Sequence, residues 1–188
     1  MDVIFASHNE NKVSEIRAIL PEKINLLYLN DIVFLDEIEE NGTTLEENSK
    51  IKAETLYKLT GKNVFADDTG LFVESLNGAP GVHSARYAGT GNSKDNREKL
   101  LKELKNSTHR KAYFKTTICL FWKDEIYFFN GEIHGEIIPE ERGEKGFGYD
   151  SIFVPDSYNQ TFAEMNLNEK NKISHRAKAV EKLINFFR

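Results

Sequence analysis

The chain has 188 residues, a length that suffices for one domain with its own hydrophobic core. Its 25 Lys and Arg residues against 30 Asp and Glu residues leave a net charge of -5, which argues against a protein that mainly neutralises a DNA or RNA backbone. The single cysteine excludes an internal disulfide framework, and no stretch has the character of a membrane span or a secretory signal. We therefore expect a cytoplasmic protein without a membrane or nucleic-acid partner.

Strands and helices alternate in the first third of the sequence. An apolar run at 3–6 predicts a strand, and apolar residues at helical spacing over 13–20 predict a helix. A second strand is expected at 24–29. The capping-box sequence at 44–47 opens a helix that Gly61 can close. The inner face of that helix is expected to carry Ile51, Leu56 and Leu59.

An acidic pair interrupts the next apolar stretch. Asp67 and Asp68 lie between the apolar runs 64–66 and 71–73, so we expect a break between two strands here. Carboxylates between apolar strands are partly desolvated, and their charge needs a nearby cation or a proton. The pair is therefore a candidate for chemistry rather than a solvated turn.

A glycine-rich loop and a long hairpin occupy the middle of the chain. The segment 76–91 is expected to form an ordered loop, followed by a short helix around Leu100. Aromatic and β-branched residues at 112–122 and 126–138 predict the two strands of the hairpin.

A second glycine-rich loop over 143–148 leads to an expected strand at 152–155. An apolar stripe from Ala177 to Phe187 predicts a helix at the end of the chain. This order of elements indicates an α/β fold, with a mixed sheet that carries helices on its faces, in one domain over 1–188.

The polar segment after the first expected strand is a candidate phosphate site. It leads into a helix N-terminus, where free backbone N–H groups and the helix dipole favour an anion. Ser7, Asn9 and Lys12 could hold phosphate oxygens, although Ser and Asn are also ordinary helix caps. The segment lacks the glycine spacing of a Walker loop. Its residues are Ser7, His8, Asn9, Glu10, Asn11 and Lys12.

Four carboxylates suggest a magnesium site. Mg²⁺ is usually held by one or two carboxylates while substrate phosphates and waters fill the other positions. Glu39 and Glu40 taken alone are better interpreted as a solvated turn, whereas Asp67 and Asp68 are not. The triplet 68–70 also matches the Asp-Thr-Gly signature of aspartic proteases, so a protease that pairs two such aspartates across a dimer is an alternative.

A late group of residues could bind a base. Glycines on either side of Phe147 free the backbone so that the ring could stack on a planar base. Asp150, His175 and Arg176 offer an acceptor and donors for base edges. Because basic residues in the first turn of a helix oppose its dipole, they favour a bound anion or acceptor nearby. A glycine-rich turn followed by a serine-capped helix is the alternative interpretation.

Five motifs follow one another along the chain. They are Phe-Ala-Ser-His-Asn-Glu-Asn-Lys at 5–12, Ala-Asp-Asp-Thr-Gly-Leu at 66–71, Leu-Asn-Gly-Ala-Pro-Gly at 76–81 with Ser-Ala-Arg-Tyr at 84–87, Gly-Phe-Gly-Tyr-Asp at 146–150 and Ser-His-Arg at 174–176. The ordered set resembles the inosine/xanthosine triphosphate pyrophosphatase family. The resemblance implies a homodimeric α/β enzyme with a long curved mixed sheet and a substrate groove between two lobes. It also implies Mg²⁺-dependent hydrolysis of ITP, dITP and XTP to the monophosphate and pyrophosphate.

The resemblance also implies roles for individual residues. Asp68 resembles the catalytic proton acceptor and, with Glu39, a metal ligand, with Glu40 as the alternative to Glu39. The segment 7–12 and Lys52 resemble triphosphate ligands, and Thr69 resembles a substrate contact. The residues that resemble nucleoside and base contacts are Phe147, Gly148, Tyr149, Asp150, Lys170, His175 and Arg176. Thr69 stands where Ser is frequent in the family and Ser151 where Pro is frequent, and neither change removes a reacting group.

The chemistry of such a reaction agrees with these residue types. Attack on the α-phosphorus needs a positioned water and basic groups that stabilise the departing pyrophosphate. A donor from His175, Arg176 or the backbone would pair with a six-keto oxygen and would stay unpaired against adenine, so we expect ATP to be rejected. The alternatives are a preference for another unusual nucleotide or an ordinary dNTP, and a nucleotide-binding module without catalysis.

Overall fold

The computed structural model describes residues 1–188 and contains a seven-stranded mixed sheet flanked by helices. The strand order is β2-β1-β3-β5-β6-β7, with β4 paired to β3. β1 pairs in parallel with β2 and β3, whereas the β3–β4 and β6–β7 pairs are antiparallel. The predicted fold class is therefore confirmed. No helix combines the length and the apolar character that crossing a membrane requires.

The elements follow the predicted order closely. In chain order they are β1 (Asp2–Phe5), α1 (Glu10–Arg17), β2 (Asn25–Tyr28), α2 (Leu45–Thr60), β3 (Val64–Val73), β4 (Pro80–Gly81), α3 (Ser93–Glu103), β5 (Lys111–Trp122), β6 (Glu125–Ile137), β7 (Phe153–Pro155), α4 (Leu167–Lys170) and α5 (His175–Phe186). The chain also contains three short 3-10 helices, Glu74–Leu76, Ser84–Arg86 and Asp150–Ile152.

The chain divides into two compact units. Unit 1 comprises Met1–Asp68, Thr116–Gly131 and Arg176–Arg188, and unit 2 comprises Thr69–Lys115 and Glu132–His175. The boundaries fall inside β3, β5, β6 and α5, so these elements contribute residues to both units. Each unit has its own buried apolar residues. A single domain, and a groove between two lobes, stay predictions.

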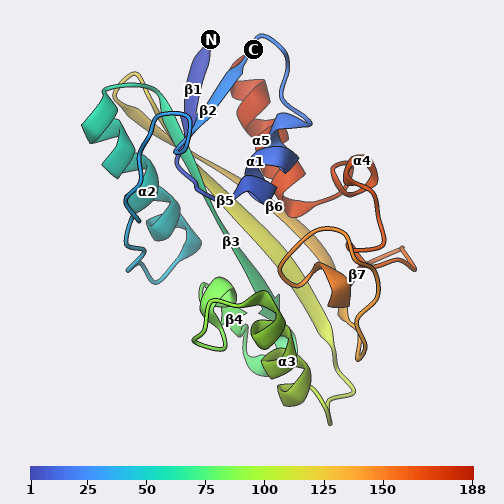
Figure 1. The fold of residues 1–188 in the computed structure, drawn as a ribbon. Coiled ribbons are helices and arrows are strands. Elements are labelled where there is room, and N and C mark those ends of the chain that lie inside the picture. The colour runs from blue at the N-terminus through green and yellow to red at the C-terminus, as the bar shows by residue number, and fades with distance from the viewer. The chain divides into compact units, whose positions relative to one another are not determined.

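In unit 1, alternate residues of each strand pack on opposite faces of the sheet. Val3 and Phe5 of β1 belong to the core formed with α1 and α5, whereas Ile4 belongs to the core formed with α2. In β3, Phe65 lies in the first core and Ala66 in the second. Figure 1 shows α2 on one side of these strands and α1 with α5 on the other. This alternation determines where the next two side chains of β3 go.

Local sequence determines both ends of α2, as predicted. The Thr44 hydroxyl accepts a hydrogen bond from the Glu47 N–H at 3.1 Å, and the Glu47 carboxylate accepts one from the Thr44 N–H at 3.3 Å. Gly61 ends the helix in the left-handed conformation, with φ at 63°. The predicted inner face is wrong at Leu59, which is 65% exposed. The buried residues are Leu45, Asn48, Ser49, Lys52, Ala53 and Leu56.

The expected break at the acidic pair is wrong, because β3 runs without interruption from Val64 to Val73. The strand can continue because each carboxylate has polar partners on its own side of the sheet, Lys12 for Asp67 and Asn48 for Asp68. Charge that is paired in this way does not force the backbone out of the sheet.

Unit 2 is built around the glycine-rich loop and the hairpin. Leu71 of β3, Phe114 of β5 and Ile137 of β6 share one buried core. The predicted loop after β3 is ordered and contributes β4, which pairs with β3. A Cβ atom on Gly70 would lie 2.6 Å from the Gly81 carbonyl oxygen, so this close approach of the two strands requires glycine.

Candidate functional site

The candidate phosphate segment connects β1 to the N-terminus of α1. Asn9 caps the helix, because its side chain accepts a hydrogen bond from the Lys12 N–H at 3.2 Å. The Ser7 hydroxyl accepts one from the Asn9 N–H at 3.1 Å. Asn9 is therefore a helix cap. The N-terminal N–H groups of α1 offer a place for an anion. Binding of phosphate stays a prediction, also for the exposed residues Glu10 and Asn11.

His8, predicted as part of the same segment, contacts the chain that follows β2. Its Nδ1 lies 3.0 Å from the Asn30 side-chain oxygen, and its Nε2 lies 3.1 Å from the Asp36 carbonyl oxygen. The imidazole also stacks near the Phe34 ring, with the centroids 6.4 Å apart. His8 therefore links the candidate phosphate segment to the loop that leads toward α2.

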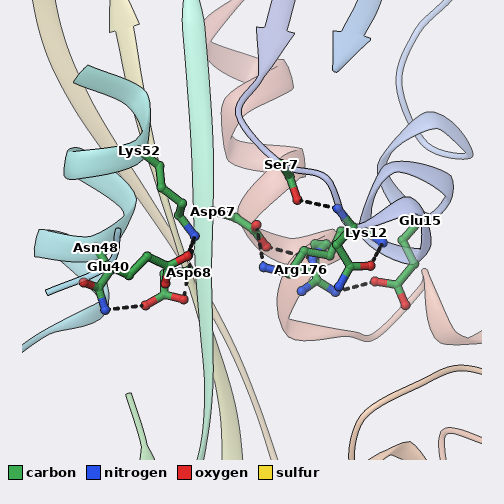
Figure 2. A network of polar contacts seen from close by, with 10 residues as sticks. Ser7, Lys12, Glu15, Glu40, Asn48, Lys52, Asp67, Asp68 and Arg176 are labelled. Carbon is green, nitrogen blue, oxygen red and sulfur yellow. Dashed lines mark hydrogen bonds and ion pairs between the residues drawn. The ribbon is translucent and has the colours of Figure 1, made fainter. Parts of the chain in front are cut away.

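Asp67 lies at the centre of a buried ion-pair network on the α1 and α5 side of the sheet (Figure 2). It is 1% exposed, and its two carboxylate oxygens lie 2.8 Å from Lys12 Nζ and 3.0 Å from Arg176 Nε. Burial alone would raise the pKa of Asp67, but the charges of Lys12 and Arg176 hold it well below its usual range. Asp67 is therefore an ionised anchor for two cations.

Glu15 completes this network and was not predicted. Its carboxylate is buried and accepts a hydrogen bond from Arg176 Nη1. Arg176 is itself only 2% exposed, so the predicted base contact is bound within unit 1 by two carboxylates. Its role toward a base stays a prediction. The signal for Glu15 is its place three residues after Lys12 on α1, which puts both side chains on one side of that helix.

Asp68 points to the opposite side of the sheet, toward α2. Asn48 Nδ2 donates a hydrogen bond to Asp68 Oδ2 at 3.2 Å, while the Asn48 side-chain oxygen accepts one from the Gly42 N–H at 2.8 Å. Lys52 Nζ lies 4.0 Å from Asp68 Oδ1. Burial raises the pKa of the Asp68 carboxyl, although the charges of Lys52 and Lys12 oppose this shift. A carboxylate with a raised pKa is suited to accept a proton.

The acidic residue that reaches this side of the sheet is Glu40, not Glu39. Both glutamates are exposed, but Glu40 Oε1 lies 2.9 Å from Lys52 Nζ. No three His, Cys, Asp or Glu side chains are grouped so as to hold a metal by themselves. Mg²⁺, however, usually takes only one or two protein carboxylates. Because Glu40 and Asp68 both face the ammonium of Lys52 (Figure 2), their oxygens fit a hard divalent cation.

In unit 2, the candidate base residues form a second buried polar cluster. Lys170 Nζ lies 2.6 Å from Asp150 Oδ2, and both side chains are almost fully buried. The same carboxylate oxygen accepts a hydrogen bond from the Phe147 N–H at 3.0 Å. The ammonium lies 5.0 Å from the centroid of the Phe147 ring. Asp150 therefore fixes both the cation and the aromatic residue of the motif.

The remaining candidate base residues are held by other parts of unit 2. The Gly148 carbonyl oxygen accepts a hydrogen bond from Arg97 Nη1 at 2.8 Å, and the Tyr149 hydroxyl donates one to the Ser84 carbonyl oxygen at 2.7 Å. The buried His175 ring stacks on Phe114, with the centroids 4.7 Å apart. Tyr149 is therefore a buried support of the loop.

The predicted residues thus fall into two sets. Unit 1 contains the segment 7–12, Glu39, Lys52, Asp68 and Arg176, and unit 2 contains Thr69, which is half-buried, and the base candidates Phe147, Gly148, Tyr149, Asp150, Lys170 and His175. A common groove for both sets stays a prediction.

The glycines beside Phe147 allow a matched stability test. A Cβ atom on Gly146 would overlap Asp150 Oδ2, whereas one on Gly148 would meet no atom within 4 Å. Both glycines have positive φ, so alanine strains the backbone at each by about 1–2 kcal/mol. Thermal unfolding should show a clearly larger loss of stability for Gly146→Ala than for Gly148→Ala. Equal losses would mean that the contact with Asp150 relaxes without cost.

Comparison with known proteins gives matches over the whole chain. A model of the Ham1 family matches residues 3–186. A dITP/XTP pyrophosphatase of Flavobacterium psychrophilum is 49% identical over 189 residues and covers 100% of both chains. A dITP/XTP pyrophosphatase of Thermoanaerobacter pseudethanolicus is 44% identical over 190 aligned positions, and the alignment covers 99% of this chain and 96% of that protein.

Solved structures give the same result. The Ham1 protein of Staphylococcus aureus is 39% identical with a TM-score of 0.89, and a HAM1 protein of Coxiella burnetii is 37% identical with a TM-score of 0.90. Each comparison covers 100% of this chain and 98% of the other. These matches confirm the resemblance that the ordered motifs indicate.

Proposed function

The chain belongs to the Ham1 family, and from this premise we propose that it hydrolyses dITP, ITP and XTP to the nucleoside monophosphate and pyrophosphate. The activity named for the Flavobacterium and Thermoanaerobacter relatives supports the substrate class. The observation that carries the proposal is the division of labour between two adjacent aspartates. Asp67 is bound by Lys12 and Arg176 on one side of β3, whereas Asp68 accepts a hydrogen bond from Asn48 and faces Lys52 on the other.

The triphosphate is bound at the N-terminus of α1. Lys12 supplies positive charge there, and Ser7 with the first N–H groups of the helix supplies hydrogen-bond donors. Burial lowers the pKa of Lys12, against the attraction of Asp67, so an anion beside its ammonium strengthens the protonated form. Asp67 positions Lys12 through their 2.8 Å ion pair. The departing pyrophosphate therefore leaves from a positively charged helix end.

Asp68 accepts the proton of the attacking water. The hydrogen bond from Asn48 fixes one of its oxygens, so the carboxylate is held in place for this transfer. Removal of the proton increases the negative charge on the water oxygen as it approaches the α-phosphorus. Because Asn48 is in turn bound to the backbone of Gly42, the carboxylate is held by a buried chain of hydrogen bonds.

Glu40 and Asp68 would hold a divalent cation, which we propose to be Mg²⁺. When bound, such an ion polarises phosphate oxygens and lowers the pKa of a coordinated water. The carboxylate oxygens of these two residues are hard ligands of the kind that this ion prefers. Glu40 takes this role in place of Glu39, because only Glu40 reaches the Lys52 ammonium beside Asp68.

The cluster around Asp150 and Lys170 recognises the base. The Phe147 ring stacks on the purine, and donors from Lys170 and His175 pair with its keto oxygen. Adenine carries an amino group at that position, which would leave a buried donor unpaired at a cost of about 1–3 kcal/mol. The proposal therefore includes rejection of ATP.

A substrate panel tests the proposed function. Pyrophosphate release is measured with ITP, dITP, XTP, dGTP, dTTP and ATP, each with and without Mg²⁺. We expect kcat/KM for the first three to exceed that for ATP by about 5- to 150-fold, since one buried donor left unpaired costs about 1–3 kcal/mol. A uniform rate across the panel would contradict the proposal. Tight ITP binding without turnover would instead establish a binding module.

The alternative of a dimeric aspartic protease is not favoured by the surroundings of Asp68. Such a site needs two carboxylates that share one proton. The carboxylate of Asp68 faces an asparagine amide and a lysine ammonium, Asn48 and Lys52. Peptide cleavage at acid pH without metal would be the contrary result.

Lys12→Ala is expected to weaken triphosphate binding. One charge-assisted contact is worth about 1.5–3 kcal/mol, so KM of the folded variant should rise by about 10- to 100-fold, and loss of the ion pair with Asp67 should also lower its stability. Lys62→Ala, which removes an exposed lysine after α2, is the matched control and should leave KM unchanged. Steady-state kinetics with XTP measures both. An unchanged KM for Lys12→Ala would remove this residue from the phosphate site.

The proposal extends to a homodimer that works in the cytoplasm. The free and buried Cys119 agrees with a reducing compartment. The homodimer follows from the family resemblance, and light scattering of the purified protein measures it.

A further inference from the structure

The ammonium of Lys52 lies beside both carboxylates proposed as metal ligands. Its Nζ is 2.9 Å from Glu40 Oε1 and 4.0 Å from Asp68 Oδ1. Figure 2 shows the lysine reaching down from α2 to the two acidic side chains. In the nucleotide-free protein, one positive charge thus stands close to the oxygens that a divalent cation would use.

Burial strengthens the electrostatic interaction between Lys52 and Asp68. The Lys52 side chain is 11% exposed and that of Asp68 is 10% exposed, whereas the Glu40 side chain is 38% exposed. Lys52 and Asp68 are fixed in α2 and β3, while Glu40 belongs to the irregular segment between β2 and α2. The lysine compensates the buried charge of Asp68 that would otherwise be costly.

A divalent cation at Glu40 and Asp68 is incompatible with Lys52 in this position. Positive charges a few ångströms apart repel strongly in a poorly hydrated site. The ammonium must therefore move away when the metal binds, and it then needs a new anionic partner. The triphosphate of the substrate supplies such a partner.

We propose that Lys52 is the counter-ion of Glu40 and Asp68 in the metal-free protein, and that its ammonium moves to the triphosphate when the metal and the nucleotide bind. This inference rests on the proposed function, because the triphosphate is the partner that Lys52 takes up. Metal binding and nucleotide binding then favour each other. The metal displaces the Lys52 ammonium from the two carboxylates, and the triphosphate gives that ammonium a new anionic partner. Lys52 is in this sense a positioning residue that couples the two events.

Mn²⁺ binding to the full-length protein without nucleotide tests the proposal. The free Mn²⁺ signal in electron paramagnetic resonance gives the dissociation constant for wild type and for Lys52→Met. We expect Lys52→Met to bind Mn²⁺ about tenfold more tightly, because it removes one repelling charge. Lys50→Met, an exposed lysine on the same helix, is the matched control and should bind as wild type does. Equal or weaker Mn²⁺ binding by Lys52→Met would overturn the proposal.

A second pair of variants locates the bound ion. Glu40→Gln should weaken Mn²⁺ binding, and Glu39→Gln should not. Loss of binding in Glu39→Gln alone would overturn the assignment. Should Lys52→Met fail to fold, a crystal structure of wild type with Mn²⁺ decides the question. We expect Lys52 Nζ to have left Glu40, and an ion bound beside an unmoved Lys52 would refute the exchange.

The binding experiment and the substrate panel can fail independently. Tighter Mn²⁺ binding by Lys52→Met in a protein that hydrolyses no triphosphate would uphold the counter-ion and refute the proposed function. Turnover of dITP and XTP together with unchanged Mn²⁺ binding by Lys52→Met would uphold the function and refute the counter-ion.

Discussion

Asp68→Asn is expected to abolish turnover while the protein folds normally. The substitution removes the proton acceptor and one proposed metal ligand at almost constant shape, so kcat should fall by about 10³-fold or more. Asn48 can still donate to the new side-chain oxygen, because the hydrogen bond at 3.2 Å needs only an acceptor there. Single-turnover kinetics with XTP measures the loss. A variant that keeps the wild-type rate would place the chemistry elsewhere.

The same variant should be at least as stable as wild type at neutral pH. Because the folded-state pKa of Asp68 is raised, the folded protein binds this proton more tightly than the unfolded chain does. The contribution of Asp68 to stability therefore falls as the pH rises from the unfolded pKa to the folded one. Asparagine is neutral at every pH and avoids this loss. Urea unfolding at pH 7 compares the stabilities of wild type and variant, and a large destabilisation of the variant would contradict the assigned pKa shift.

The different environments of the two aspartates follow from the period of a strand. Successive side chains in β3 alternate between faces, so Asp67 meets the α1 and α5 side and Asp68 meets the α2 side. With a break in the strand, the two aspartates would form one acidic group. Had the strand been continued through the pair, the alternation alone would have separated their roles.

The parts of the fold predicted correctly depend on local rules. The capping box at Thr44 and the left-handed Gly61 determine α2 within the sequence itself. The turn Lys123-Asp124, with both φ values positive, joins the two strands of the predicted hairpin. Neither feature depends on what packs against it.

The parts that were missed depend on distant partners. Leu59 satisfies the helical spacing of an inner face, but Lys52 and Asn48 take the buried positions because Asp68 binds them from β3. Glu15 is buried because Arg176, far along the chain, pairs with it. Pairs of residues far apart in the chain leave no periodic pattern in the sequence, so only the three-dimensional structure shows them.

Asp67→Asn, the same change one residue earlier, is expected to have the opposite effect on stability. It leaves the buried cations Lys12 and Arg176 with Glu15 as the remaining carboxylate of their network, and breaking a buried ion pair in this way costs about 3–5 kcal/mol. The folded pKa of Asp67 is lowered, so its contribution is present above the unfolded pKa and is lost as the pH falls through the folded one. Urea unfolding should therefore show a large difference between wild type and variant at pH 7, which shrinks below about pH 4. With Asp68→Asn as the matched control, equal stabilities of the two variants at pH 7 would contradict the distinct roles of the two aspartates.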